Sequence, residues 1–115
     1  MATLEPRDLV QAAIDAYHDH DLDRCLSFYT PDVVVTDAEG AVIMRGSEEV
    51  RGRYAASMAK HPNLHYDIPQ RMAVGSFVID EELVTGFSAG GPEMLRAVLV
   101  YRFVDAKISA IQILN

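Results

Sequence analysis

The sequence has little cysteine, little positive charge and no long hydrophobic run, and each shortage excludes a class of protein. Cys25 is the only cysteine, so an intramolecular disulfide is impossible and a cytosolic setting is expected. Lys and Arg number 10 against 17 Asp and Glu, and the net charge of -7 argues against nucleic acid or an anionic membrane as a partner. No apolar run approaches the ~20 residues of a membrane span, and residues 1–8 lack the apolar segment of a signal peptide. We therefore expect a cytoplasmic protein.

Length and composition predict one domain. The chain of 115 residues is long enough for one hydrophobic core and too short for two. Apolar residues make up 50% of the chain, which favours folding over disorder. No repeat or low-complexity linker divides the sequence, so residues 1–115 are expected to form a single domain.

The periodicity of apolar residues predicts an α+β fold. Helical spacing begins at Pro6, resumes after a candidate cap at Asp21, and returns after another candidate cap at Ser47. Extended patterns cover residues 33–37, 41–45, 64–74, 77–87, 94–103 and 108–114, with an irregularity at Pro69 and room for a bend at 80–82. This order predicts helices packed on one side of a curved, mostly antiparallel sheet, which leaves a conical cavity for a small ligand.

Asp37 is a lone carboxylate at the end of the valine-rich segment 33–36. It either caps the turn at Glu39 and Gly40 or faces a pocket. In a pocket, loss of solvent would raise its pKa and suit it to work as a general base near neutrality. The residues around it leave both placements open.

Several segments together resemble the nuclear-transport-factor-2-like superfamily, in its SnoaL-like and ketosteroid-isomerase-like branch. They are YHDHDLD at 17–23, FYTPDV at 28–33, Asp37 with Gly40, RGSEEVR at 45–51, and VYRF at 100–103 with Lys107 and Ile108. The resemblance implies a cone-shaped, highly curved, mostly antiparallel sheet wrapped by three N-terminal helices, a cystatin-like or NTF2-like α+β barrel. It is specific for fold and weak for function, because this fold hosts many activities.

The resemblance also implies a site. It places Asp37 where ketosteroid isomerases keep their proton-shuttling aspartate, and Tyr54 where a third-helix tyrosine supports the oxyanion hole. The two oxyanion donors are not matched, since Ala13 and Leu99 stand at their positions. Removing one such donor typically costs about 3–4 kcal/mol of barrier, so efficient steroid isomerisation is not expected. Tyr17 or Tyr101 would have to donate from a different direction.

Alternation along 94–103 separates an inner from an outer set of side chains. The inner set is apolar or aromatic, and the outer set mixes valines with Arg96 and Arg102. The mixed outer face predicts a homodimer formed through the sheet. The predicted pocket-facing residues are Tyr17, Met58, Phe87, Ala97, Leu99 and Tyr101.

Neither a metal nor a cofactor is expected. His18 and His20 point to different sides of a helix, so a solvated helix end is a better interpretation than a metal site. Cys25 lies on an apolar helix face, which favours packing over nucleophilic chemistry. Residues 89–92 lack the lysine and the following helix of a phosphate-binding loop.

Two functions remain. The first is an enzyme that isomerises, dehydrates or cyclises a lipophilic carbonyl or hydroxyl compound without a cofactor, with Asp37 moving the proton and Tyr54 orienting it. The second is a non-catalytic module that binds a small apolar or aromatic ligand or mediates association, which the unmatched oxyanion donors suggest. We favour the enzyme, because Asp37 has no obvious structural need to lie where it does.

Overall fold

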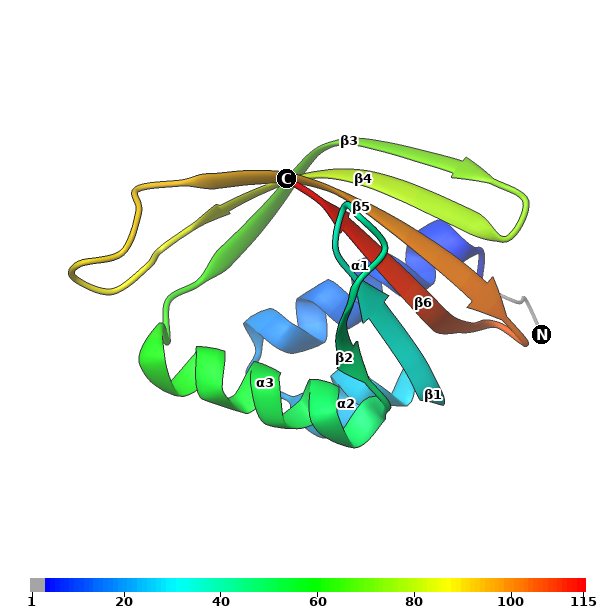
Figure 1. Cartoon of the computed structure of the whole chain (residues 1–115), viewed down its shortest axis with the longest axis horizontal. Coiled ribbons are helices and arrows are strands. Elements are labelled where there is room, and N and C mark those ends of the chain that lie inside the picture. The colour runs from blue at the N-terminus through cyan, green and yellow to red at the C-terminus, as the bar shows by residue number, and fades with distance from the viewer. Residues whose placement is uncertain (1–3) are drawn as a thin grey trace.

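The computed structural model describes residues 4–115, and in it three helices lie within the curve of a six-stranded sheet (Figure 1). This arrangement confirms the predicted α+β class. The elements are α1 (Pro6–His18), α2 (Leu22–Ser27), β1 (Tyr29–Thr36), β2 (Val42–Arg45), α3 (Ser47–Lys60), β3 (His65–Val74), β4 (Phe77–Thr85), β5 (Leu95–Val104) and β6 (Lys107–Leu114). Among these residues, no helix has the length and apolar composition needed to cross a membrane.

The sheet is curled but not closed into a barrel. Its strand order is β2-β1-β6-β5-β4-β3, so β2 and β3 form its two edges. Neighbouring strands run antiparallel except β1 and β6, which are parallel. The irregularity expected at Pro69 is confirmed, because the pairing of β3 with β4 shifts register between Asp67 and Gln70.

The helix starts follow the predicted residues with one correction. Asp21 caps α2, where its side chain accepts a hydrogen bond from the Arg24 N–H at 3.1 Å. Ser47 was expected to cap α3, but it is the first residue of the helix and Gly46 occupies the cap position. The chain turns there with a φ of 87° at Gly46, a conformation that glycine adopts at little cost.

β4 continues as one strand through residues 80–82, where the sequence left room for a turn. Residues Asp80 to Glu82 pair one by one with β5 and, apart from the shift near Pro69, with β3 on the other side. Hydrogen bonding to two neighbours keeps this acidic stretch extended. Asp80 and Glu82 therefore both point to the inner face of the sheet, while Glu81 points outward.

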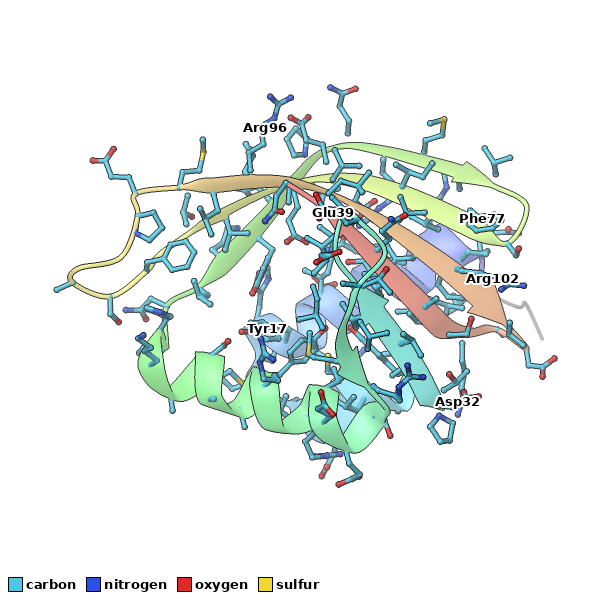
Figure 2. The ribbon with its side chains drawn as sticks, in the orientation of Figure 1. Tyr17, Asp32, Glu39, Phe77, Arg96 and Arg102 are labelled. Carbon is cyan, nitrogen blue, oxygen red and sulfur yellow. The ribbon has the colours of Figure 1, made fainter. Side chains whose placement is uncertain are left out.

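The core fills the space between the inner face of the sheet and the helices. Its most deeply buried members include Val10 of α1, Val33 of β1, Val50 of α3, Val78 of β4 and Ile108 of β6. The predicted alternation on β5 is confirmed: its central inner side chains are buried and its outer arginines are exposed. Figure 2 shows the two sides, with Tyr17 between the sheet and α3 and Arg96 pointing outward from the sheet.

Candidate functional site

A cavity of about 140 Å³ opens between the inner face of the sheet and the helices, and we call it the central cavity. Every helix and strand contributes to its wall, so its shape depends on the whole fold. The wall is mostly aliphatic and aromatic, which is typical of a site for a small organic ligand. Its residues are Val10, Ala13, Ile14, Tyr17, Cys25, Tyr29, Val35, Met44, Tyr54, Tyr66, Glu82, Leu99, Tyr101, Ile111 and Ile113.

Glu82 is the one acidic residue in this wall. It is 7% exposed, and its carboxyl group has no hydrogen-bond or ion-pair partner within residues 4–115. Burial raises its pKa from 4.5 to about 7, and the negative charge of Asp80 adds to the effect. A carboxyl group in this state accepts or releases a proton readily at neutral pH.

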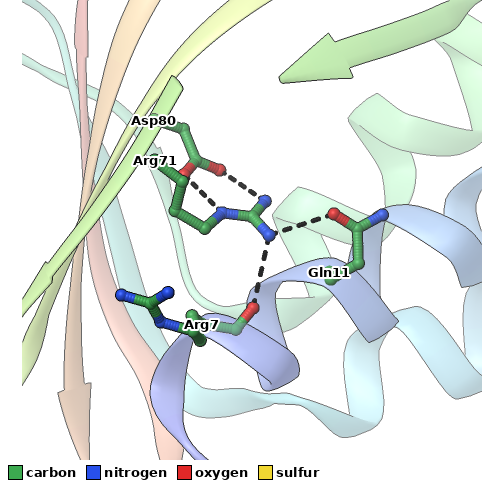
Figure 3. Close-up of polar contacts among 4 residues, drawn as sticks. All are labelled: Arg7, Gln11, Arg71 and Asp80. Atoms are coloured by element: carbon green, nitrogen blue, oxygen red, sulfur yellow. Dashed lines mark hydrogen bonds and ion pairs between the residues drawn. The ribbon is translucent and has the colours of Figure 1, made fainter. Parts of the chain in front are cut away.

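Asp80 lies on the same face of β4 and has the opposite environment. It is fully buried, and Arg71 of β3 binds it through two parallel contacts, Nε to Oδ1 at 2.7 Å and Nη2 to Oδ2 at 2.9 Å (Figure 3). Arg71 Nη1 also donates to the Gln11 side chain at 3.0 Å and to the Arg7 carbonyl at 3.4 Å. These contacts hold the guanidinium between β4 and α1, where it forms an ion pair with Asp80 and not with Glu82.

Five tyrosines from five elements form the aromatic part of the central cavity, and four of them, all but Tyr101, contact one another. The hydroxyls of Tyr29 and Tyr54 hydrogen-bond to each other at 2.9 Å. The Tyr17 ring meets Tyr54 and Tyr66 edge to face, with centroid distances of 5.4 and 5.1 Å. Burial is the main cause that raises the pKa of each of these four groups, so their hydroxyls stay protonated and remain able to donate.

The Tyr17 hydroxyl differs from the Tyr29–Tyr54 pair because it lacks a partner. It is fully buried and makes no hydrogen bond within residues 4–115. The hydroxyls of Tyr66 and Ser57 lie close enough to offset part of the rise in its pKa, but neither has the geometry of a hydrogen bond to it. Tyr17 thus offers the cavity a donor that the protein itself does not use.

The structure places Asp37 outside the central cavity. Its Oδ1 atom accepts hydrogen bonds from the N–H groups of Glu39 and Ala41, both at 2.9 Å. The carboxylate therefore caps the turn between β1 and β2, which is the structural alternative that the sequence left open. The pocket placement expected for Asp37 is corrected accordingly, because the two N–H donors of this turn hold its side chain there.

The other predicted pocket residues divide into two groups. Tyr54, Tyr17, Leu99 and Tyr101 line the central cavity. The remaining three, Phe87, Ala97 and Met58, are not among its lining residues. Phe87 follows β4, and its ring centroid lies 5.2 Å from that of His61. Ala97 is partly buried on β5 opposite Glu82, and Met58 packs in the core. Ala13 and Leu99, which the resemblance to ketosteroid isomerases sets at the positions of their oxyanion donors, do lie in the wall.

Sequence reasoning missed Glu82, although a signal was present. Val78, Asp80, Glu82 and Val84 alternate along β4 and are all buried. This period of two, read as a regular strand, would have put both carboxylates on the inner face. The three consecutive acidic residues instead resembled a turn.

The histidines and the cysteine do not add a second reactive centre. His18 Nε2 accepts a hydrogen bond from the Tyr66 N–H at 2.9 Å, and its ring stacks on His65 at 4.5 Å. Within residues 4–115 no three His, Cys, Asp or Glu side chains are grouped to hold a metal ion. Burial raises the pKa of the Cys25 thiol to about 12, which keeps it protonated and unreactive.

Comparison with known families and structures agrees with this fold. Residues 10–111 match the model of the family described as SnoaL-like domain. No curated protein matches the chain. An uncharacterised cystatin-fold protein from Novosphingobium aromaticivorans is 30% identical and superposes with a TM-score of 0.89, over 98% of this chain and 100% of that chain.

Two further structures are similar in fold alone. A hypothetical protein with a ketosteroid isomerase-like fold from Catenulispora acidiphila, solved in complex with trimethylamine, is 24% identical with a TM-score of 0.74, over 91% of this chain and 82% of that one. A putative polyketide cyclase from Sinorhizobium meliloti is 19% identical with a TM-score of 0.77, over 96% of this chain and 99% of that one.

Proposed function

The chain belongs to the SnoaL-like domain family, and from this premise we propose that it catalyses proton transfer on a small lipophilic carbonyl or hydroxyl compound bound in the central cavity. The reaction is an isomerisation, dehydration or cyclisation and needs no cofactor. Glu82 moves the proton, in place of the Asp37 expected from the sequence. Cytoplasmic location remains part of the proposal, since the lone Cys25 suits a reducing compartment.

One observation carries this proposal: Glu82 is a buried carboxyl group with no partner among residues 4–115, in a wall that is otherwise aliphatic and aromatic. Structural carboxylates in protein interiors are normally paired, as Asp80 is with Arg71. An unpaired carboxyl group in the interior lowers the stability of the fold, and a functional role for Glu82 would account for this cost. A pKa of about 7 means that Glu82 is partly ionised at neutral pH and exchanges protons in either direction.

The proposed step begins with ionised Glu82. Its carboxylate removes a proton from a carbon next to the carbonyl group. The electron pair of that C–H bond forms a carbon–carbon double bond, and the π pair of the carbonyl group moves onto its oxygen as the enolate forms. The Tyr17 hydroxyl donates a hydrogen bond to this oxygen. Glu82 then returns the proton at another carbon, which completes an isomerisation, or delivers it to a departing hydroxyl group, which completes a dehydration.

Tyr17 would donate its hydrogen bond from a position that is not one of the two oxyanion-donor positions of ketosteroid isomerases. The positions of the family's two oxyanion donors hold Ala13 and Leu99, which have no polar hydrogen to donate. A single donor at Tyr17 stabilises an enolate less than two donors would, so we expect modest rates. Tyr54 contributes indirectly, since it fixes Tyr29 by a hydrogen bond and supports the Tyr17 ring.

The experiment that tests the proposal compares Glu82→Gln with Asp37→Asn. Exchange of ketone α-protons with solvent deuterium, followed by NMR, reports the proposed step. We expect Glu82→Gln to slow the exchange about 100-fold or more, the range typical for loss of a general base, and Asp37→Asn to retain it. The reverse pattern would reject Glu82 and restore Asp37 as the base.

A second candidate function is a non-catalytic binding module for a small organic cation. Tyrosine faces together with an unpaired carboxylate form a setting that suits an alkylammonium group. The Catenulispora protein, solved with trimethylamine, makes this ligand class worth testing here. If the second candidate holds, trimethylammonium raises the melting temperature of the wild type, Glu82→Gln abolishes the rise, and no ketone exchange is detected.

We also propose that two copies associate through the outer face of the sheet. Met72, Val74 and Phe77 are exposed there, at 54%, 61% and 41%, and the Arg96–Glu81 ion pair lies on the same face. An apolar patch with polar groups beside it is typical of a protein interface. Sedimentation over a dilution series that shows only monomer at micromolar protein would reject the dimer.

A further inference from the structure

The Tyr17 hydroxyl defines one end of the ligand. It is buried and unpartnered within the described residues, and edge-to-face contacts with Tyr54 and Tyr66 hold its ring in place. A buried hydroxyl without a hydrogen bond is costly. A ligand oxygen that enters the central cavity relieves this cost by accepting the free O–H.

The volume of the cavity limits the size of the ligand. It measures about 140 Å³, and an apolar protein cavity of about 150 Å³ accommodates one benzene molecule. One six-membered ring with small substituents therefore fits. Two fused rings exceed this volume, so the second ring must either displace a wall residue such as Leu99 or project from the mouth of the cavity.

The charges of the wall limit the polarity of the ligand. The lining residues include no Lys, Arg or His, and Arg71 is committed to Asp80. A carboxylate or phosphate would meet Glu82 without any cation to offset its charge. The ligand part that enters the cavity is therefore not an anion. Its group at Tyr17 is not an ammonium either, because an ammonium has no lone pair to accept the free O–H.

We propose that the ligand is a neutral, single-ring carbonyl compound, with its oxygen at the Tyr17 hydroxyl and an acidic C–H group facing Glu82. The contact with Glu82 rests on the proposed function. The size limit and the Tyr17 contact do not depend on turnover, so binding alone tests them.

The first experiment measures the affinity of cyclohex-2-enone and of cyclohexene, the same ring without the oxygen, for the whole chain by ligand-detected NMR. We expect Tyr17→Phe to weaken cyclohexenone binding roughly three- to tenfold, the value of one hydrogen bond, and to leave cyclohexene binding unchanged. An equal effect on both ligands, or no effect on cyclohexenone, would overturn the Tyr17 contact. Failure of cyclohexenone to bind at millimolar concentration would overturn the whole inference.

A second series tests size and charge. Tetralone, with two fused rings, should bind the wild type more weakly than cyclohexenone and should gain affinity in Leu99→Ala, where the cavity is larger. Cyclohexanecarboxylate and cyclohexylammonium should both bind more weakly than cyclohexenone. Tighter binding of tetralone, of the acid or of the amine to the wild type would overturn the assigned class.

Proton exchange in the same samples separates this inference from the proposed function. Tyr17-dependent binding of cyclohexenone without α-proton exchange supports the ligand class and rejects the role of Glu82 as a base. Glu82-dependent exchange that is indifferent to Tyr17→Phe supports the base and overturns the Tyr17 contact.

Discussion

Asp80 and Glu82 lie one strand repeat apart on the inner face of β4, and within the described residues only Asp80 has a cation to neutralise it. The pair shows two outcomes for a buried carboxyl group. Asp80 forms an ion pair with Arg71, whereas Glu82 faces an apolar cavity and has a pKa raised to about 7. The contrast assigns a structural role to the first and makes the second a candidate for chemistry.

The raised pKa of Glu82 predicts that stability falls as the pH rises. A group with a folded pKa above its unfolded value contributes stability that is fully present below about 4.5 and is lost as the pH passes 7. The shift from 4.5 to about 7 corresponds to about 3 kcal/mol. Urea unfolding should show that the wild type loses most of this amount, relative to Glu82→Gln, between pH 5 and pH 8. Equal pH dependence of the two proteins would show that Glu82 titrates normally.

The unpartnered hydroxyl of Tyr17 predicts a stabilising deletion. Tyr17→Phe removes a buried polar group that has no hydrogen bond, so we expect the free energy of unfolding to rise by about 1 kcal/mol. Tyr54→Phe is the matched control, because it leaves the Tyr29 hydroxyl without its partner and should destabilise by about 1 kcal/mol. Destabilisation by Tyr17→Phe would mean that Tyr17 finds a partner in solution.

Arg71 and Asp80 predict a strongly non-additive pair of substitutions. Arg71→Met leaves a fully buried carboxylate without its cation and should cost about 3–5 kcal/mol. Adding Asp80→Leu removes the stranded charge and should recover much of the loss, as measured by chemical denaturation of the two single variants and the double variant. Additive losses would show that the two side chains stabilise the fold independently.

His18 predicts a second and opposite dependence on pH. Burial and the neighbouring His65 lower its pKa below 6.5, although Asp15, Asp19 and Asp67 partly offset them. A lowered pKa means that the stability from neutral His18 is present above pH 6.5 and is lost as the pH falls through the folded value. NMR titration of the His18 ring should give a midpoint below 6.5. A midpoint above 6.5 would show that the three aspartates outweigh burial and His65.

Local sequence patterns were sufficient for the order of the elements and for the family, although β1 begins at Tyr29 and not at residue 33. Pro6 begins α1, Asp21 caps α2 through its own side chain, and Pro69 marks the register shift in β3. These features depend on contacts within a few residues, which is why they can be read from the chain. The cap of α3 was misplaced by one residue. The sequence Gly46-Ser47 fits either a serine cap or a glycine cap, and the structure has glycine there with a φ of 87°.

The site could be predicted only in part. Tyr17, Tyr54, Leu99 and Tyr101 were predicted and do line the central cavity. Asp37, the predicted base, caps a turn instead, and Glu82, which was not predicted, lies in the wall of the cavity. Their difference arises from the turn N–H groups around Asp37 and from the neighbours of β4, which are distant in sequence.

By itself, the sequence determined the α+β class, the order of helices and strands, the inner and outer faces of β5, and membership of the family. Periodicity and turn residues encode these properties locally. Tertiary structure decided which carboxylate is buried without a partner, which tyrosine hydroxyl is left free, and how large the cavity is. Each of these depends on side chains that come together from separate helices and strands. Burial among those side chains raises the pKa of Glu82, and the lack of an acceptor among them leaves the Tyr17 hydroxyl free to donate.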